Sequence, residues 1–268
     1  MTQLGESVMV AFVADEAADD KCPFCYKARH EFPSKKFPAD SKVVSKPKDL
    51  KCAYLPVKGQ WDHTTAAHHL ISAMQCYAKL RRLVRMASMV GYDINNPNNG
   101  ISLPTVANNI TYSLDGAAPR KYGKFSEPEK RRIAFSVMRQ SAAQWHVGHH
   151  AVKVDIPQDW ADETEDCFLG HEVSYDESVI KELLTLLAKW VDKGWCEKEE
   201  DHSDDIKKSM DNLSGRIKSK LDCFGTASPR SSTPFFVSAM AHDYANTHGA
   251  QGSDAEPDDD DPPPRLDS

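Results

Sequence analysis

Apolar residues recur at helical spacing in four separate segments, and this pattern constrains the fold of the chain more than any other feature. In an amphipathic helix, apolar side chains repeat every three or four residues and line one face. The segments with this repeat are residues 66–91, 126–146, 176–195 and 205–221. Patterns typical of strands are scarce by comparison. The sequence therefore predicts a mainly α fold with a small β-hairpin.

Two helix boundaries are marked by specific residues. Ser126 can cap the second segment, Glu129 can reach back to complete a capping box, and Pro128 suits a first helical turn. The first segment is followed by Asp93 to Gly100, a run rich in asparagine that contains one proline. Such a composition predicts a structured turn.

Composition divides the chain into four parts. Residues 1–60 hold five prolines and little helical periodicity, which predicts an irregular region. Residues 61–155 contain two groups of histidines and form the predicted core. Residues 156–225 are predicted to be a helical extension, and residues 226–268 a largely disordered acidic tail. No apolar run approaches the ~20 residues that cross a bilayer, and we identify no signal peptide.

The net charge of -7 is unevenly distributed along the chain. Residues 1–60 carry 10 Lys and Arg against 8 Asp and Glu, residues 61–160 carry 12 against 7, and residues 161–268 carry 11 against 25. The acidity therefore lies in the last third, while the middle is mildly basic. A mildly basic middle permits phosphate binding there.

Five of the eleven histidines fall in two tight groups. The first is the pair His68 and His69, and the second contains His146, His149 and His150. Adjacent side chains on an extended segment point to opposite faces, so one imidazole of the pair can hold a metal ion while the other addresses a water. His146 and His150 are four residues apart, which on a helix places both imidazoles on one face as ligands for one ion.

Imidazoles arranged in this way can support phosphodiester chemistry. Three neutral imidazoles around a divalent cation leave coordination positions for a phosphate oxygen and for water. A further histidine close to the cation, but not bound to it, stays neutral and can act as a general base. Imidazole ligands suit zinc, nickel and other transition ions, and magnesium or manganese remains open as the working ion, so the sequence predicts one divalent ion without its identity.

Three blocks of the sequence together resemble the AHH family of nucleases, which belongs to the HNH/endonuclease VII (His-Me finger) superfamily. The blocks run from Ala67 to Ile71, from Gly91 to Pro104 and from His146 to His150. Members of this family are found mainly as toxin domains of bacterial polymorphic toxins and delivered effectors. The resemblance implies a ββα-metal core embedded in additional helices, within roughly residues 60–155.

The resemblance also implies roles for the matching residues. His68 would be a metal ligand at the end of a short strand, and His69 the general base that activates water. Asn99 would orient that base through the connecting loop. His146 and His150 would complete the metal site from a helix.

Several residues near this centre have two interpretations. His149 is either a bystander or a hydrogen-bond donor behind a ligand, and it competes with its neighbours as a ligand. Arg81, Arg82 and Arg85, like the basic run 130–132, either form solvated helix faces or bind backbone phosphates.

The cysteines suggest a second metal site. Seven cysteines, an odd number, in a chain without a recognised secretion signal argue against a disulfide framework. Cys22 and Cys25 form a C-x-x-C pair, and Cys52 follows. With His30 or His63 they can hold a structural zinc ion; otherwise they are free thiols. A thioredoxin-like role is disfavoured because no βαβ pattern surrounds the pair.

These patterns predict a metal-dependent endonuclease, with DNA favoured over RNA by the resemblance. A toxin would be made in a bacterial cytoplasm without a signal peptide, delivered by a specialised secretion system, and neutralised by a cognate immunity protein. The alternative is a non-catalytic zinc-binding protein whose helices dock a partner. Acidity after residue 161 further suggests a segment that partly covers the basic centre, or one that serves only solubility.

Overall fold

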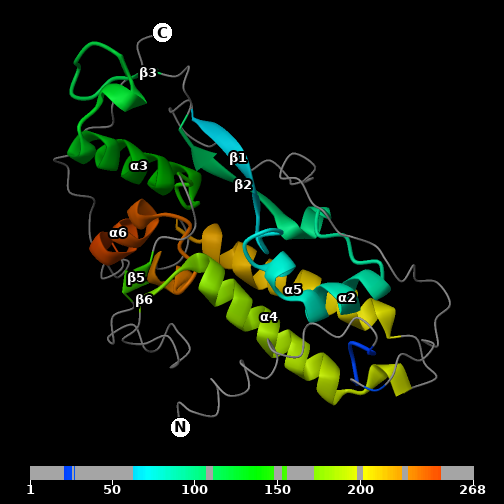
Figure 1. The fold of residues 1–268 in the computed structure, drawn as a ribbon. Coiled ribbons are helices and arrows are strands. Elements are labelled where there is room, and N and C mark those ends of the chain that lie inside the picture. Colours follow the sequence, from blue (N-terminus) through cyan, green and yellow to red (C-terminus); the bar gives the residue numbers. More distant parts are fainter. Residues whose placement is uncertain are drawn as a thin grey trace. The chain divides into compact units, whose positions relative to one another are not determined.

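A computed structural model describes residues 21–25, 27, 63–106, 111–147, 153–155, 172–197, 202–224 and 229–248 (Figure 1). The chain folds as two compact units. The first contains the described residues of Met1–Lys51, His69–Gly100 and Val179–Gly215. The second contains those of Cys52–His68, Ile101–Ser178 and Arg216–Ser268. Each unit thus combines stretches that the sequence assigned to different parts.

The described fold is mainly helical, with three two-stranded sheets, as the sequence predicted in outline. Strand β1 (Thr64–His69) pairs with β2 (Gly100–Thr105), and both are visible side by side in Figure 1. Strand β3 (Thr111–Tyr112) is antiparallel to β4 (Arg120–Lys121), and β5 (Val154–Asp155) to β6 (Glu172–Val173). The predicted hairpin near the first histidine pair corresponds to β1 and β2.

In the first unit, helix α2 (Arg81–Met89) begins later than the predicted start at residue 66. Residues 66–80 instead form the end of β1, a turn and the 3-10 helix η3 (Tyr77–Lys79). The apolar residues Leu70, Ile71 and Tyr77 are buried there without forming an α-helix. Gly91, with a φ of 66°, lies just beyond the helix. The 3-10 helix η4 (Pro97–Asn99) follows, and the side chain of Asn96 accepts hydrogen bonds at its start. The predicted turn is confirmed.

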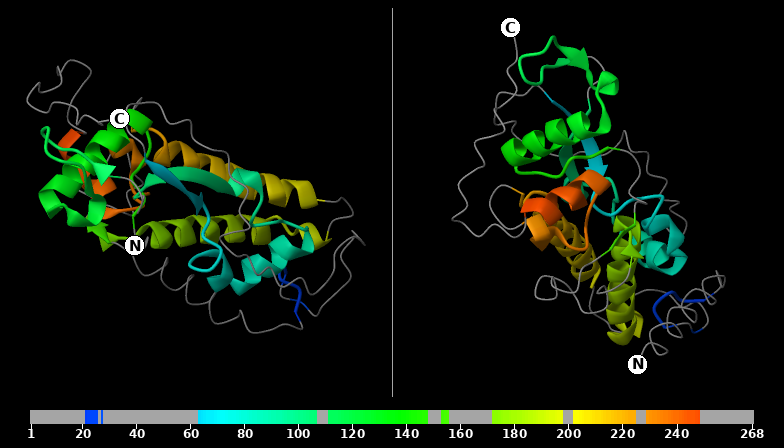
Figure 2. Two further views of the ribbon diagram at one scale, coloured as in Figure 1. Left: turned by 90° about the horizontal axis from the view of Figure 1, so that it is seen from above. Right: turned by 90° about the vertical axis from the view of Figure 1, so that its left-hand side faces the viewer.

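Helices α4 (Tyr175–Asp192) and α5 (Ser203–Leu221) agree closely with the prediction. Their parts in the first unit run side by side in both views of Figure 2, and Trp190 Nε1 donates to Ser209 Oγ at 3.0 Å. Gly194, with a φ of 56°, allows the chain to turn after α4 into the 3-10 helix η8 (Trp195–Glu197). The first unit therefore buries Leu183, Leu187 and neighbouring apolar side chains along these helices.

In the second unit, helix α3 (Glu127–Ser141) starts as the sequence predicts, with Ser126 and Glu129 forming a capping box. It ends five residues earlier than expected, because Ala142 takes a left-handed conformation with a φ of 58°. Trp145, expected on the apolar face of this helix, is instead buried beyond its end. The 3-10 helix η5 (Tyr122–Lys124) precedes α3.

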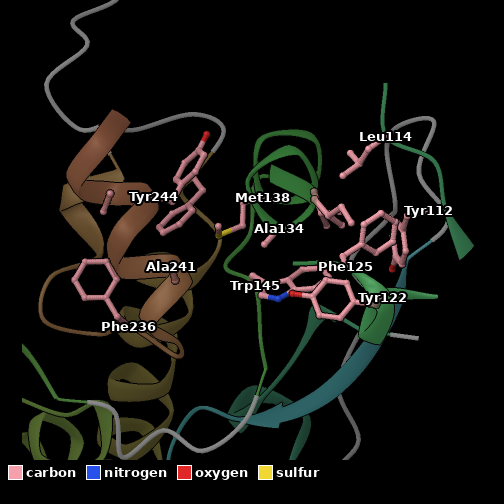
Figure 3. Close-up of a cluster of buried hydrophobic side chains, with 14 of the residues drawn as sticks. Tyr112, Leu114, Tyr122, Phe125, Ala134, Met138, Trp145, Phe236, Ala241 and Tyr244 are labelled. Atoms are coloured by element: carbon pink, nitrogen blue, oxygen red, sulfur yellow. The ribbon is translucent and has the colours of Figure 1, made fainter. Parts of the chain in front are cut away.

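The core of the second unit gathers aromatic side chains around α3 (Figure 3). Trp145 packs near Tyr122, with ring centres 6.0 Å apart. The 3-10 helix η9 (Pro229–Ser232) and helix α6 (Ala239–His248) contribute to this unit, and Phe236 and Tyr244 belong to the same cluster. The expectation of a disordered region from residue 226 is therefore wrong for 229–248; residues 249–268 lie outside the described part.

None of the described helices is both long and apolar enough to span a membrane.

Candidate metal sites and catalytic residues

His68 is a buried residue of β1 in the second unit, with only 2% of its surface exposed. Its Nε2 atom lies 3.2 Å from the hydroxyl oxygen of Tyr175, the first residue of α4. The two rings meet edge to face, with centres 5.4 Å apart. A histidine that binds a metal through one nitrogen commonly hydrogen-bonds through the other. The Tyr175 hydroxyl is placed to provide that second contact.

His146 lies beside His68, although it is not on a helix as expected. Because α3 ends at Ser141, His146 lies in the segment that follows the helix. Two hydrogen bonds hold its main chain to β2. The His146 N–H donates to the Pro104 carbonyl at 2.8 Å, and Thr105 Oγ1 donates to the His146 carbonyl at 2.5 Å. Burial lowers the pKa of His146. The neutral imidazole that metal binding requires is thereby favoured.

The rings of His68 and His146 are in edge-to-face contact, at a separation that is common for packed aromatic rings and is also compatible with two ligands of one ion. Their ring centres are 5.1 Å apart, with the ring planes inclined by 64°. A ligating nitrogen lies ~2.1 Å from zinc and its ring centre ~1.1 Å further, so two rings at a tetrahedral angle have centres about 5.2 Å apart. The predicted partners His149 and His150 lie outside the described residues.

His69 belongs to the first unit and contacts a different set of residues. Its Nε2 atom lies 3.0 Å from Oδ1 of Asn95, in the turn before η4. An amide oxygen only accepts hydrogen bonds, so this contact calls for a proton on Nε2, and the lone pair of a neutral ring is then on Nδ1. Asn95 is itself positioned by its N–H, which donates to Oδ1 of Asp93 at 2.9 Å. This arrangement suits an imidazole that accepts a proton at Nδ1.

Asn99 fixes the chain that follows His69. It is fully buried, and its Oδ1 accepts from the Ile71 N–H at 2.8 Å and from Ser214 Oγ at 3.0 Å. Its Nδ2 donates to the carbonyls of Ile71 and Ile94, and its own carbonyl accepts from the Leu70 N–H. Asn99 thus touches the residues after His69 rather than the imidazole. Orientation of the base through the loop, as the resemblance implies, remains a prediction.

The C-x-x-C pair is joined by a third cysteine that the sequence did not indicate. In the first unit, Cys22, Cys25 and Cys196 each offer a sulfur, and these atoms lie within 4.8 Å of one another. Burial, together with the neighbouring Cys22 and Cys25, raises the pKa of the Cys196 thiol. These three residues could hold a metal ion. The predicted ligand Cys52 and the alternative His30 lie outside the described residues.

Two of the arginines proposed to bind phosphate instead support the cysteine turn. Arg82, only 4% exposed, donates to the carbonyls of Pro23 at 2.6 Å and Phe24 at 3.1 Å. Arg85 donates to the Lys21 carbonyl at 2.7 Å. The phosphate prediction is therefore wrong for Arg82, because its guanidinium is buried against main chain. Arg81 is exposed at the start of α2.

The second basic run, residues 130–132, is engaged in ion pairs on α3. Arg131 pairs with Asp243 at 2.7 Å, and Arg132 forms two hydrogen bonds of 2.9 Å to the carboxylate of Asp115. Lys130 pairs with Glu127 at 2.6 Å. These ion pairs favour the interpretation of this run as a solvated helix face over phosphate binding.

Sequence reasoning missed Asn95, Tyr175 and Cys196. Asn95 had a signal, because it lies in the asparagine-rich turn, but the turn holds four asparagines and spacing does not rank them. Tyr175 and Cys196 are far along the chain from the residues they contact, and neither belongs to a motif. Only the tertiary fold brings them to the histidine and to the cysteine pair.

Comparison of the chain with protein-family models, with curated proteins and with solved structures found no match.

Proposed function

We propose that the chain is a metal-dependent endonuclease that hydrolyses phosphodiester bonds, with DNA favoured over RNA as substrate. The observation that supports this most is the pairing of His68 with His146, at a separation that suits two ligands of one ion. These residues come from two of the three sequence blocks that resemble the nuclease family. A ββα-metal core with His150 as a further ligand is also part of the proposal, although His146 follows the end of α3 and is not on the helix.

In this proposal His68 and His146 hold a divalent cation through their imidazole nitrogens. When bound, such an ion stabilises negative charge on the scissile phosphate and on the departing oxygen. The Tyr175 hydroxyl, 3.2 Å from His68 Nε2, orients the His68 ring.

His69 acts as the general base. Its Nδ1 removes a proton from water while the water oxygen forms a bond to phosphorus and the bond from phosphorus to the leaving oxygen breaks. The leaving oxygen then takes a proton from solvent. Asn95 supports this role because its Oδ1 accepts a hydrogen bond from Nε2–H and so stabilises the imidazolium that forms.

The biological setting proposed here rests on the resemblance. A nuclease of this family acts as an antibacterial toxin or effector, made in the bacterial cytoplasm and passed to a target cell by a specialised secretion system. The producing cell then needs a cognate immunity protein. We propose that this partner presents carboxylates to exposed basic residues of the mildly basic middle of the chain.

A second candidate function is supported by the cysteine group. Cys22, Cys25 and Cys196 suit a structural metal ion, and a chain that used its metal only in this way would be a non-catalytic zinc-binding interaction protein. Nuclease activity distinguishes the two candidates.

The proposal is tested by plasmid nicking with a panel of divalent ions. We expect His69→Ala to reduce the rate at least ~100-fold, because a general base contributes that much or more, while calorimetry of the zinc-loaded chain shows nearly unchanged binding of Ni²⁺. His68→Ala should weaken Ni²⁺ binding as well as nicking. His248→Ala, at the end of α6, is the matched control and should nick at the wild-type rate.

Undiminished cleavage by His69→Ala would remove His69 as the base. Absence of cleavage by the wild-type chain with every ion would favour the interaction protein.

A further inference from the structure

The three clustered cysteines differ from the other described cysteines. Five cysteines are free in the described part of the chain, and three of them converge. Cys76 and Cys223 lie elsewhere, buried among apolar and hydroxyl side chains. Cys22 and Cys196 are also buried, whereas Cys25 is half-buried. Three sulfurs gathered from two distant segments are more than packing requires, because a single cysteine fills a core as a small apolar residue.

The main chain around the cysteine pair is fixed by hydrogen bonds. Cys22 N–H donates to the Lys27 carbonyl at 3.0 Å, which closes the turn on itself. Arg82 binds the carbonyls of the two residues between the cysteines, and Phe24 is fully buried. The two cysteine side chains are thereby presented together by a rigid turn. Preorganisation of this kind is typical of metal sites rather than of exposed thiols.

The third sulfur comes from the turn after α4. Cys196 is the second residue of η8. This 3-10 helix begins directly after Gly194, which has a left-handed backbone conformation. Two thiolates on one tetrahedral zinc ion are ~3.8 Å apart, since each Zn–S bond is ~2.3 Å. Sulfur atoms within 4.8 Å of one another reach this spacing through small side-chain rotations.

We propose that Cys22, Cys25 and Cys196 supply three of the four ligands of a structural zinc ion that fastens the C-x-x-C turn and α2 to the turn after α4. Soft thiolate donors select zinc among the common cellular divalent ions. Three thiolates and Zn²⁺ carry a net charge of about -1, and the guanidinium groups of Arg82 and Arg85, bonded to the same turn, offset it. This site is separate from the histidines and does not rest on the proposed nuclease function.

The inference is tested on the full chain by Co²⁺ substitution and metal analysis. We expect the wild-type chain to retain about one zinc ion through dialysis, and its Co²⁺ form to show thiolate charge-transfer bands and tetrahedral visible bands. Cys196→Ser should lower the intensity of the thiolate bands by about a third or remove them. Cys223→Ser, the matched buried control, and His68→Ala should keep the thiolate bands at full intensity. Loss of the bands in Cys52→Ser but not in Cys196→Ser would overturn the assignment.

A second measurement covers the case in which Cys196→Ser does not fold. Alkylation of the wild-type chain, mapped by peptide mass spectrometry, should spare Cys22, Cys25 and Cys196 until a chelator is added. At least a tenfold rise in modification rate at these three residues is expected on chelation. Equal rates with and without chelator, or a disulfide between any two of them, would contradict the proposal.

Discussion

The cysteine group (Cys22, Cys25 and Cys196) and the histidine pair formed by His68 and His146 are two places where metal-binding side chains converge. They differ in their donor atoms and in the residues that hold them in place. The cysteine group has three sulfur donors from one compact unit, and its turn is held by a buried arginine. The histidine pair has two nitrogen donors, and the contact beside it is a tyrosine hydroxyl. Sulfur donors suit a structural ion when a fourth ligand completes the tetrahedron, whereas two imidazoles leave positions for substrate and water.

This difference suggests that the two regions respond differently to mutation. Changes near the cysteines should alter stability and zinc content together. Changes near the histidines should alter activity or affinity while the zinc-bound turn persists. Three substitutions test this separation.

The largest effect is expected from Asn99→Ala. This change leaves the Ile71 N–H and the carbonyls of Ile71 and Ile94 without their partner in a buried place, which should cost about 3 kcal/mol of unfolding free energy. Nicking should fall as well, because the chain after His69 loses its support, while the Co²⁺ thiolate spectrum is retained. Denaturant unfolding measures the first effect.

Asn98→Ala is the matched control for that measurement. Asn98 is exposed and donates only one side-chain hydrogen bond of 3.0 Å to Asp211 among the described contacts. Its loss should cost less than about 0.5 kcal/mol. Equal losses for the two variants would show that Asn99 is not the support of this loop.

A smaller effect is expected from Tyr175→Phe, which removes the hydroxyl beside His68 but keeps the ring. Loss of a hydrogen bond behind a metal ligand typically weakens binding by about tenfold. Calorimetry of the zinc-loaded chain with Ni²⁺ should show this change, whereas Tyr244→Phe, in the same unit, should bind as wild type. An unchanged affinity in Tyr175→Phe would separate Tyr175 from the site.

The smallest effect concerns Glu129, which lies at the start of α3 and away from both groups. The pKa of Glu129 is lowered from 4.5 to about 2. The hydrogen bond from the Ser126 N–H has the largest effect, and the hydrogen bond from Arg120 has the second largest. A lowered carboxyl pKa stabilises the fold above pH 4.5, and this contribution is lost as the pH falls toward 2. Between about pH 2 and pH 4.5, unfolding of the Glu129→Gln variant should therefore take up about one proton fewer than unfolding of the wild-type chain.

The check for Glu129→Gln is the slope of unfolding free energy against pH, which should be shallower than that of the wild-type chain. The rate of nicking and the Co²⁺ spectrum should not change. Equal slopes would mean that the capping box adds nothing to acid stability.

The sequence predicted the local features of the fold better than its long-range contacts. Helical periodicity and the capping box at Ser126 located α3, α4 and α5, because these signals are local. The ending of α3 before His146 was missed, since alanine at residue 142 gives no stop signal. Helix α6 was missed because its weakly patterned sequence is stabilised by packing of Tyr244 into the aromatic core.

The candidate sites follow the same division. The His68 and His69 pair was visible as a motif, and its strand is confirmed. Tyr175 and Cys196 depend on contacts between distant segments, which no spacing rule reveals. Arg82 was misinterpreted because a basic residue on an amphipathic helix usually faces solvent, whereas here main-chain carbonyls bury it.

The central claim is that an ion at the histidine pair drives nicking independently of the zinc-bound turn. Its most direct test is a chelator titration of the full chain that follows plasmid nicking, zinc content and far-UV circular dichroism together. We expect nicking to be lost first, with zinc and helical signal retained, and to return when a divalent ion is added. Nicking that disappears only as zinc leaves and the chain unfolds would contradict it.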